Sequence, residues 1–205
     1  MRETPWGMWD PLPPGELVEE LRALDAHWWL AGGFALEAWV GRPWREHDDI
    51  DAAISRPDQL RLRSLLEGWD PHAADPPGQL RPWAPGEELP PAVHDIWVRR
   101  GAGGPWKFQF MLDETEDGNW VYRRDGRIRL PQRDLWWERK GVRYIRPEVQ
   151  LLYKSRSRRP KDEVDFTVVM PLLRHDELGW LEAALALSDP SNPWLTRVRA
   201  QMARI

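Results

Sequence analysis

The chain has 205 residues, of which 41% are hydrophobic and 30% charged, a composition typical of a globular protein without a membrane-spanning segment. It contains no cysteine, which excludes disulfides, thiol nucleophiles and thiolate metal sites, and its first residues lack the pattern of a signal peptide, so we expect a cytoplasmic protein. The formal net charge of −4 argues against unspecific nucleic-acid binding as the main activity.

The N-terminal region predicts an irregular arm followed by a helix. Residues 1–14 are rich in proline and tryptophan and lack periodicity. In residues 16–26, Leu17, Leu21 and Leu24 have the spacing of one face of an amphipathic helix. We expect most of the fifteen tryptophans to be buried in the core, because an indole buries a large apolar area.

The stretch from residue 28 to residue 54 organises the rest of the chain. The apolar run of residues 28–31 predicts a short strand, Gly32 and Gly33 predict a turn, and residues 34–40 predict a helix that ends at Gly41. The free N–H groups and the dipole at a helix N-terminus favour an anion such as phosphate. A phosphate site is therefore expected at the Gly-Gly turn.

A second strand, predicted over residues 47–54, carries two carboxylates. Because side chains alternate along a strand, Asp49 and Asp51 project to one side while Ile50 points into the core. Two unpaired carboxylates this close repel each other unless a cation lies between them. Oxygen ligands of this kind suit Mg²⁺, which is commonly held by one or two carboxylates together with substrate phosphates.

The Gly-Gly turn with its helix, followed by Asp-Ile-Asp with Arg42, Arg45 and His47 just upstream, resembles the nucleotidyltransferase superfamily of DNA polymerase β. It is particularly similar to the small members that adenylylate aminoglycosides or lincosamides. The resemblance is dense over residues 28–54 and looser elsewhere. It implies in-line attack by a substrate hydroxyl on the α-phosphorus of a nucleoside triphosphate such as ATP, with Mg²⁺ bound and pyrophosphate leaving.

The middle of the chain predicts a helix and then a hairpin. Residues 55–67 begin with a proline and carry an apolar stripe of leucines, which predicts a helix. Residues 69–91 are rich in proline and glycine and predict loop with one short strand. Residues 92–99 and 106–112 predict two strands joined by a glycine-rich turn.

Asp95 lies in the middle of an otherwise apolar predicted strand, where an acidic residue is unusual and calls for a functional or structural explanation. The resemblance implies a third metal-binding or general-base carboxylate on a neighbouring strand, and we assign this role to Asp95. Asp113, at the end of the next strand, is the alternative. A purely structural alternative is that Asp95 pairs with an arginine such as Arg99.

The C-terminal part predicts helices. Residues 119–145 alternate short strand-like runs with basic turns and are expected to complete the sheet, and helices are expected over residues 147–157, from 160 onward, over 176–187 and over 193–203. The predicted architecture is α/β, a mixed nucleotidyltransferase-type sheet flanked by helices. Residues 1–145 would form the core, with its N-terminal arm and helix, and residues 146–205 a helical C-terminal region.

A basic cluster lies between the first two of these helices and comprises Lys154, Arg156, Arg158, Arg159 and Lys161. Such a cluster is either a solvated helix end or a triphosphate contact. The resemblance favours Lys154 and Lys161 as triphosphate ligands, with Asp162 and Asp165 orienting these cations or capping the helix.

The resemblance also implies roles near the Gly-Gly turn. Gly32 and Gly33 would let the backbone approach the β- and γ-phosphates. Arg42 and Arg45 would clamp phosphate, because a guanidinium binds oxyanions bidentately. His47 shares the predicted face of the two aspartates and would touch the nucleotide, although a lone histidine is more often structural.

The acceptor is left open by the sequence. The acidic residues of segments 113–117 and 87–88 suit a cationic aminosugar, but solvated loop charges explain them equally well. Our leading hypothesis is transfer of AMP to a hydroxyl of a small molecule, such as an aminoglycoside-like antibiotic, by a monomer or homodimer. The alternatives are a toxin-type nucleotidyltransferase acting on tRNA or protein, which the basic cluster would support, and a non-catalytic, antitoxin-like binding protein.

Overall fold

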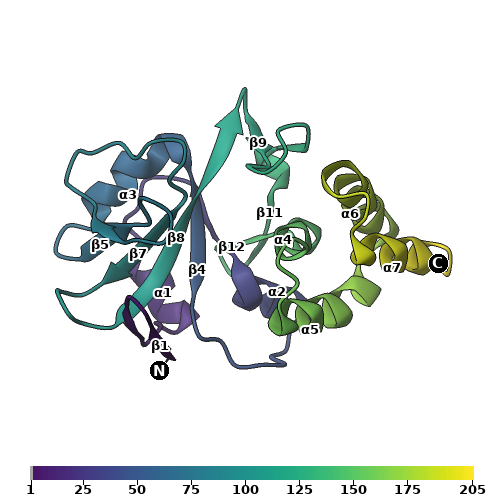
Figure 1. Cartoon of the computed structure of the whole chain (residues 1–205), viewed down its shortest axis with the longest axis horizontal. Helices are drawn as coiled ribbons and strands as arrows, with labels where there is room; N and C mark the ends of the chain where they lie inside the picture. The colour runs from purple at the N-terminus through teal and green to yellow at the C-terminus, as the bar shows by residue number, and fades with distance from the viewer. Residues whose placement is uncertain (1) are drawn as a thin grey trace.

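The computed structural model describes residues 2–205 and has a mixed sheet at its centre, with helices on both faces (Figure 1). The main path of the sheet runs β11-β12-β3-β4-β8-β7-β5-β6. Its strands are β1 (Arg2–Thr4), β2 (Gly7–Trp9), β3 (Trp28–Leu30), β4 (Asp51–Ser55), β5 (Asp70–Ala73), β6 (Arg81–Pro82), β7 (Asp95–Arg99), β8 (Trp106–Glu116), β9 (Asn119–Val121), β10 (Arg129–Pro131), β11 (Trp136–Arg139) and β12 (Val142–Ile145). The prediction of an α/β fold with a mixed sheet is confirmed.

Seven α-helices accompany the sheet within residues 2–205. They are α1 (Pro14–Glu20), α2 (Gly32–Val40), α3 (Gln59–Leu65), α4 (Pro147–Lys154), α5 (Pro160–Val169), α6 (His175–Ser188) and α7 (Pro193–Met202). All regular structure after Ile145 in the described chain is helical. None of the helices in residues 2–205 combines the length and apolarity needed to cross a bilayer.

The register of the central strands places acidic side chains on one face of the sheet. Strands β4 and β8 are parallel, with Asp51 opposite Gln109 and Ser55 opposite Asp113. Strands β7 and β8 are antiparallel, with Asp95 opposite Met111. Because facing residues of neighbouring strands project to the same side, Asp51, Asp95 and Asp113 share one face.

The alternation along β4 divides the interior into two hydrophobic clusters. Ile50, Ala52 and Ile54 are fully buried on the side covered by α1 and α3. Ala53 joins the opposite cluster, which includes buried residues of α2 and of all four C-terminal helices. The C-terminal helices therefore share a hydrophobic core with the sheet, and the face bearing the acidic residues lies toward them.

Several predicted elements differ from the structure. The strand predicted over residues 47–54 begins only at Asp51, so Asp49 and Ile50 lie in the preceding loop, and the helix predicted over residues 147–157 ends at Lys154. The N-terminal arm contains a hairpin, β1–β2, whose second strand pairs in parallel with β8 through Trp9 and Trp106, so it is not irregular. Residues 69–91 contain two short strands, β5 and β6, where one was predicted. The first helix is shorter than its leucine pattern, because the chain leaves α1 after Glu20 in turns that still bury Leu21 and Leu24.

Candidate active site

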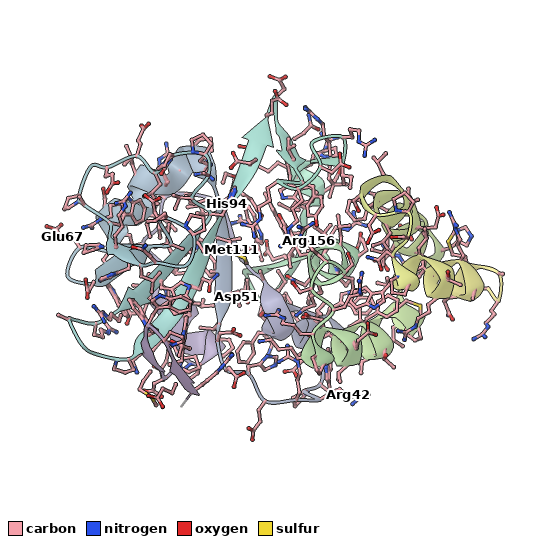
Figure 2. All side chains as sticks on the ribbon, viewed as in Figure 1. Arg42, Asp51, Glu67, His94, Met111 and Arg156 are labelled. Atoms are coloured by element: carbon pink, nitrogen blue, oxygen red, sulfur yellow. The ribbon has the colours of Figure 1, made fainter. Side chains whose placement is uncertain are left out.

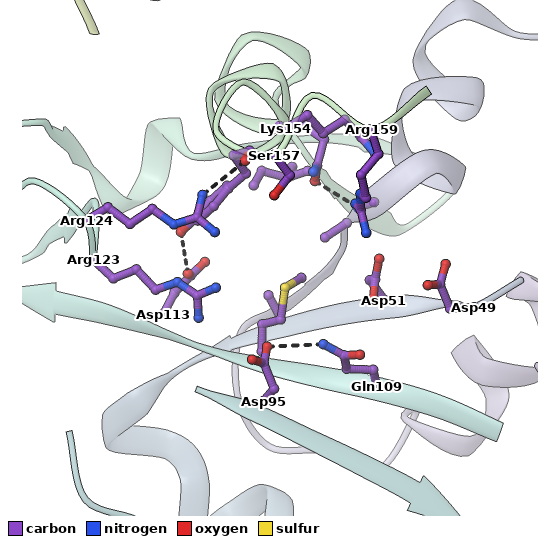
Figure 3. A pocket seen from close by; sticks show the side chains of 17 residues that line it. Asp49, Asp51, Asp95, Gln109, Asp113, Arg123, Arg124, Lys154, Ser157 and Arg159 are labelled. Atoms are coloured by element: carbon purple, nitrogen blue, oxygen red, sulfur yellow. Dashed lines mark hydrogen bonds between the residues drawn. The ribbon is translucent and has the colours of Figure 1, made fainter. Parts of the chain in front are cut away.

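A cavity of about 270 Å³ lies between the acidic face of the sheet and the start of the helical region. It contains both signs of charge (Figure 3). The acidic lining residues are Asp49, Asp51, Asp95 and Asp113, and the basic ones are Arg123, Arg124, Lys154 and Arg159. An anionic ligand can therefore meet cations here while a carboxylate pair remains available for a metal ion.

The carboxylate pair follows from the start of β4. Asp51 is the first residue of the strand, Asp49 precedes it by two, and their carboxylates lie side by side, facing Lys154 and Arg159 (Figure 3). Burial, reinforced by the nearby Asp49 charge, raises the pKa of Asp51 to about 7. The nearest cation to Asp49 is Lys161, whose Nζ lies 3.6 Å from Oδ2. Among the described residues, no cation forms an ion pair with Asp51, so its negative charge is not compensated.

The Gly-Gly turn is shaped by side chains of the protein itself. Gly32 has a φ of +68°, and a Cβ at this position would lie 2.3 Å from Asp51 Oδ2. A Cβ on Gly33 would lie 2.2 Å from Arg45 Nη2 and 2.3 Å from His47 Cε1. Glycine is therefore required at both positions whether or not phosphate binds. Gly32 lines the cavity and donates its N–H to Gln150 Oε1 at 2.8 Å, whereas Gly33 is not part of the lining.

Arg45 and His47 have structural partners and are absent from the cavity lining, in contrast to their predicted phosphate and nucleotide contacts. The Arg45 guanidinium donates through Nε and Nη2 to Asp165, at 2.8 and 2.9 Å. The His47 ring stacks on Phe34, with ring centroids 4.1 Å apart, and its Nε2 lies 2.9 Å from Glu37 Oε2. Burial lowers the pKa of His47, which favours a neutral ring. Both side chains fix the loop between α2 and β4.

Arg42 also lies outside the cavity lining. It is exposed at the edge of the molecule, away from Asp51 and Met111 near its centre (Figure 2). The predicted phosphate clamp of Arg42 has no geometric support.

Lys154, by contrast, lines the cavity. Its Nζ lies 3.3 Å from Asp162 Oδ1 and 3.0 Å from Asp165 Oδ2, and the side chain is buried. Asp162 also accepts the backbone N–H of Arg159, at 3.0 Å, and so caps α5. Asp162 and Asp165 thus hold Lys154, and Asp162 caps the helix, as predicted, but in the described chain neither of them pairs with Lys161. Lys161 is outside the lining and reaches the site through its contact with Asp49.

Asp95 and Asp113 both line the cavity, so the structure keeps both candidates for the third carboxylate. Asp95 Oδ1 accepts a hydrogen bond from Gln109 Nε2 at 3.1 Å. The structural alternative for Asp95 is wrong, because Arg99 pairs instead with Asp70, at 2.7 Å. Asp113 accepts from the Tyr153 hydroxyl at 2.7 Å, and burial raises its pKa to about 6.

The three predicted metal ligands do not form a compact set. Within residues 2–205 no three acidic or histidine side chains gather closely enough to hold a metal ion by themselves. Asp49 and Asp51 form a pair, and Asp95 lies apart from them beside Gln109 (Figure 3). A bound cation would therefore take two carboxylates from the protein and other oxygens from its ligand.

Several lining residues were not predicted from the sequence. Arg123 projects into the cavity (Figure 3) and forms no ion pair with the described part of the chain. Arg124, Gln150 and Ser157 also line it, and Arg159, which the sequence offered only as one member of the basic cluster, does so as well. The sequence shows Arg123 and Arg124 only as part of a basic turn after β9, and the pairing of β8 with β9 is what brings that turn to the cavity.

A strand, a Gly-Gly turn and a helix, followed by a carboxylate pair at the start of the next strand, are arranged as in a nucleotidyltransferase-type fold. A crystal structure of the lincosamide antibiotic adenylyltransferase LnuA with lincomycin bound has the same fold, with a TM-score of 0.52 and 18% identity over 77% of this chain and 96% of that one. Residues 15–70 match the family model of the aminoglycoside-2''-adenylyltransferases, so the resemblance to antibiotic-modifying adenylyltransferases is confirmed.

Two further solved structures are similar over most of the chain. ANT(2'')-Ia in complex with adenylyl-2''-tobramycin is 16% identical, with a TM-score of 0.46 over 93% of this chain and 94% of that one. An antigenic nucleotidyltransferase-like protein from Paracoccidioides brasiliensis is 19% identical, with a TM-score of 0.46 over 94% and 95%. A search of curated protein sequences found no match.

Proposed function

We propose that this protein is a Mg²⁺-dependent nucleotidyltransferase that transfers AMP from ATP to a hydroxyl group of a small antibiotic-like molecule. The observation that carries the proposal is the Asp49–Asp51 pair, which faces Lys154 and Arg159 across one cavity. A triphosphate with a divalent cation satisfies both sides of this arrangement at once, because phosphate oxygens pair with the basic groups while the carboxylates hold the cation.

The chemistry of Asp49 and Asp51 suits a magnesium ion. Asp51 is half-buried beside a second carboxylate, and its raised pKa reflects a negative charge that lacks a close counter-ion. Asp49 and Asp51 would hold the ion, which when bound neutralises charge on the phosphates. Lys161 already lies near Asp49 and would share the triphosphate side of the site.

The chain's own residues account for the remaining requirements of the reaction. Lys154 and Arg159 are fixed by Asp162, so they meet the phosphates without first being ordered. Arg123 offers a further cation from the opposite wall. The Asp95 carboxylate would accept the proton of the attacking hydroxyl, and Gln109 orients it.

The tRNA-directed alternative depends on a free basic surface, but four of the five cations of the basic cluster pair with carboxylates, and of the five only Arg156 is left exposed without an ion-pair partner in residues 2–205. Lys154, Arg159 and Lys161 have carboxylate partners in and around the cavity. Arg158 pairs with Asp189 at 3.7 Å. These cations therefore support a small anionic ligand better than a long nucleic-acid track.

Turnover tests the proposal. Pyrophosphate release would be measured with ATP, GTP, CTP and UTP, each with Mg²⁺, in the presence of lincomycin or tobramycin, together with the mass of the modified acceptor. We expect ATP-dependent release that is lost in Asp51→Asn and kept in Asp48→Asn, an exposed neighbour outside the cavity lining. A folded protein that binds MgATP but modifies no hydroxylated acceptor would favour the non-catalytic alternative.

A further inference from the structure

A second cavity of about 200 Å³ adjoins the candidate active site, and Asp95 and Gln109 line both. Its other walls come from the β1–β2 hairpin, the connection between β5 and β6, and β7. Asp95 lies across the first cavity from Lys154 and Arg159 (Figure 3), and neither of these two cations lines the second cavity. In-line attack needs the acceptor on the side opposite the leaving pyrophosphate.

The wall of the second cavity is aromatic. Trp6 is 41% exposed, although an indole is usually buried, and its ring lies 5.8 Å from that of Trp97 at 83°. The hairpin turn holds Trp6 in place, because Trp106 Nε1 donates to the Trp6 carbonyl at 2.8 Å. Leu80 completes the apolar surface. A fixed and exposed indole of this kind offers a face for stacking against the apolar side of a ring.

The charge of the second cavity does not suit a polycation. Among the described residues that line it, Asp95 is the one ionisable side chain. Three of the six acidic residues that the sequence offered for an aminosugar have arginine partners: Glu87 pairs with Arg81, Glu114 with Arg56 and Glu116 with Arg129, each at 2.6 Å. A ligand with several ammonium groups would find few carboxylates to compensate its desolvation.

Building on the proposed function, we propose that the second cavity is the acceptor site and that Trp6, Leu80 and Trp97 determine its specificity. It takes a hydroxylated ring compound with an apolar face and at most one positive charge, and places one hydroxyl at Asp95. The acceptor class is therefore closer to a lincosamide than to an aminoglycoside, although the family model matched by residues 15–70 is named for the latter.

Calorimetric titration with lincomycin and with tobramycin tests this inference, with and without Mg²⁺ and the non-reacting α,β-methylene analogue of ATP. We expect wild type to bind lincomycin, which has one basic amine, at least about tenfold more tightly than tobramycin, which has several. Trp6→Ala should weaken lincomycin binding about tenfold, whereas Trp6→Phe, which keeps an aromatic face, should retain most of it. Leu80→Glu should weaken lincomycin binding and strengthen tobramycin binding.

Trp180→Ala, on α6 and outside both cavities, is the control for loss of an indole elsewhere. A substitution of Trp97 would be a poorer test than one of Trp6, because Trp97 packs against Trp9 and Trp106 and its loss would disturb the folding of the hairpin region. Tighter binding of tobramycin, no binding of lincomycin, or unchanged lincomycin binding in folded Trp6→Ala would overturn the inference. If wild type did not bind the ATP analogue, the proposed function would be refuted. Comparing lincomycin binding by wild type and Trp6→Ala would still show whether the second cavity binds a ligand against Trp6.

Discussion

Replacing Asp51 by asparagine should stabilise the ligand-free protein at alkaline pH. The pKa of Asp51 rises from its usual 3.8 to about 7, because the carboxylate is buried and lies beside Asp49. The difference is roughly three pKa units at about 1.4 kcal/mol each, which sets an upper limit of about 4 kcal/mol for the cost of ionising Asp51 in the folded state. Because Asp51 keeps partial contact with solvent, we expect Asp51→Asn to raise the free energy of unfolding by about 2 kcal/mol at pH 8.

The pH dependence gives this prediction its sign. Between pH 3.8 and 7 the folded protein retains the Asp51 proton while the unfolded chain has lost it, so wild-type stability falls relative to the variant as pH rises through this window. Below pH 3.8 the two proteins should differ little. Buried groups such as Asp113 and Glu148, which also have raised pKa values, are present in both proteins and cancel in the difference.

Urea denaturation of wild type, Asp51→Asn and Asp48→Asn at pH 4 and pH 8 measures the effect. Asp48→Asn should show no comparable change between the two pH values, because its side chain is half exposed. Adding Mg²⁺ and ATP at pH 8 should stabilise wild type and not Asp51→Asn, since a ligand stabilises only the state that binds it. An Asp51→Asn variant no more stable than wild type at pH 8, or a stability gap that does not grow between pH 4 and pH 8, would refute the reasoning.

Two further changes test the surroundings of the site. Gly33→Ala should lower the free energy of unfolding by about 2 kcal/mol, because the added methyl group lies 2.2 Å from Arg45 Nη2 and 2.3 Å from His47 Cε1; an unchanged urea midpoint would contradict this packing. Tyr153→Phe removes the hydroxyl that donates to Asp113 at 2.7 Å, so the pKa of Asp113 should move further above its usual value and stability should fall by about 1 kcal/mol. Carboxyl-carbon NMR titration measures that pKa, and a lowered value would show that the hydroxyl does not stabilise the carboxylate.

The features that the sequence predicts well are local ones. The strand, glycine turn and helix of residues 28–40 lie within one short segment, and each has its own signal in propensity or turn chemistry. The burial of Ala52 and Ile54 on the side of β4 away from Asp51 follows from strand alternation, whereas Asp49 and Ile50 precede the strand and are placed by the loop that leads into it. The hairpin of β7 and β8 likewise follows from two apolar runs and a glycine-rich turn.

The parts that could not be predicted depend on contacts between distant residues. The sequence predicts that Arg45 binds phosphate, but in the structure its guanidinium donates hydrogen bonds to Asp165, 120 residues later in the chain. Arg123 looked like a loop residue, but the pairing of β9 with β8 carries it to the cavity. The exposed face of Trp6 arises because the N-terminal hairpin pairs with β8, and no local pattern reports that pairing. Sequence periodicity fixes which side of an element is buried, but it does not say which element covers it.

The most direct test of the central claim is calorimetric titration of ATP into the protein with and without Mg²⁺, on wild type and on the Asp49→Asn/Asp51→Asn double variant. We predict that wild type binds ATP only with Mg²⁺, that the double variant does not bind it, and that Asp48→Asn binds like wild type. ATP binding that does not depend on Mg²⁺ or on the two aspartates, or no binding of any nucleoside triphosphate by folded wild type, would contradict the assignment of this cavity as a nucleotidyltransferase site.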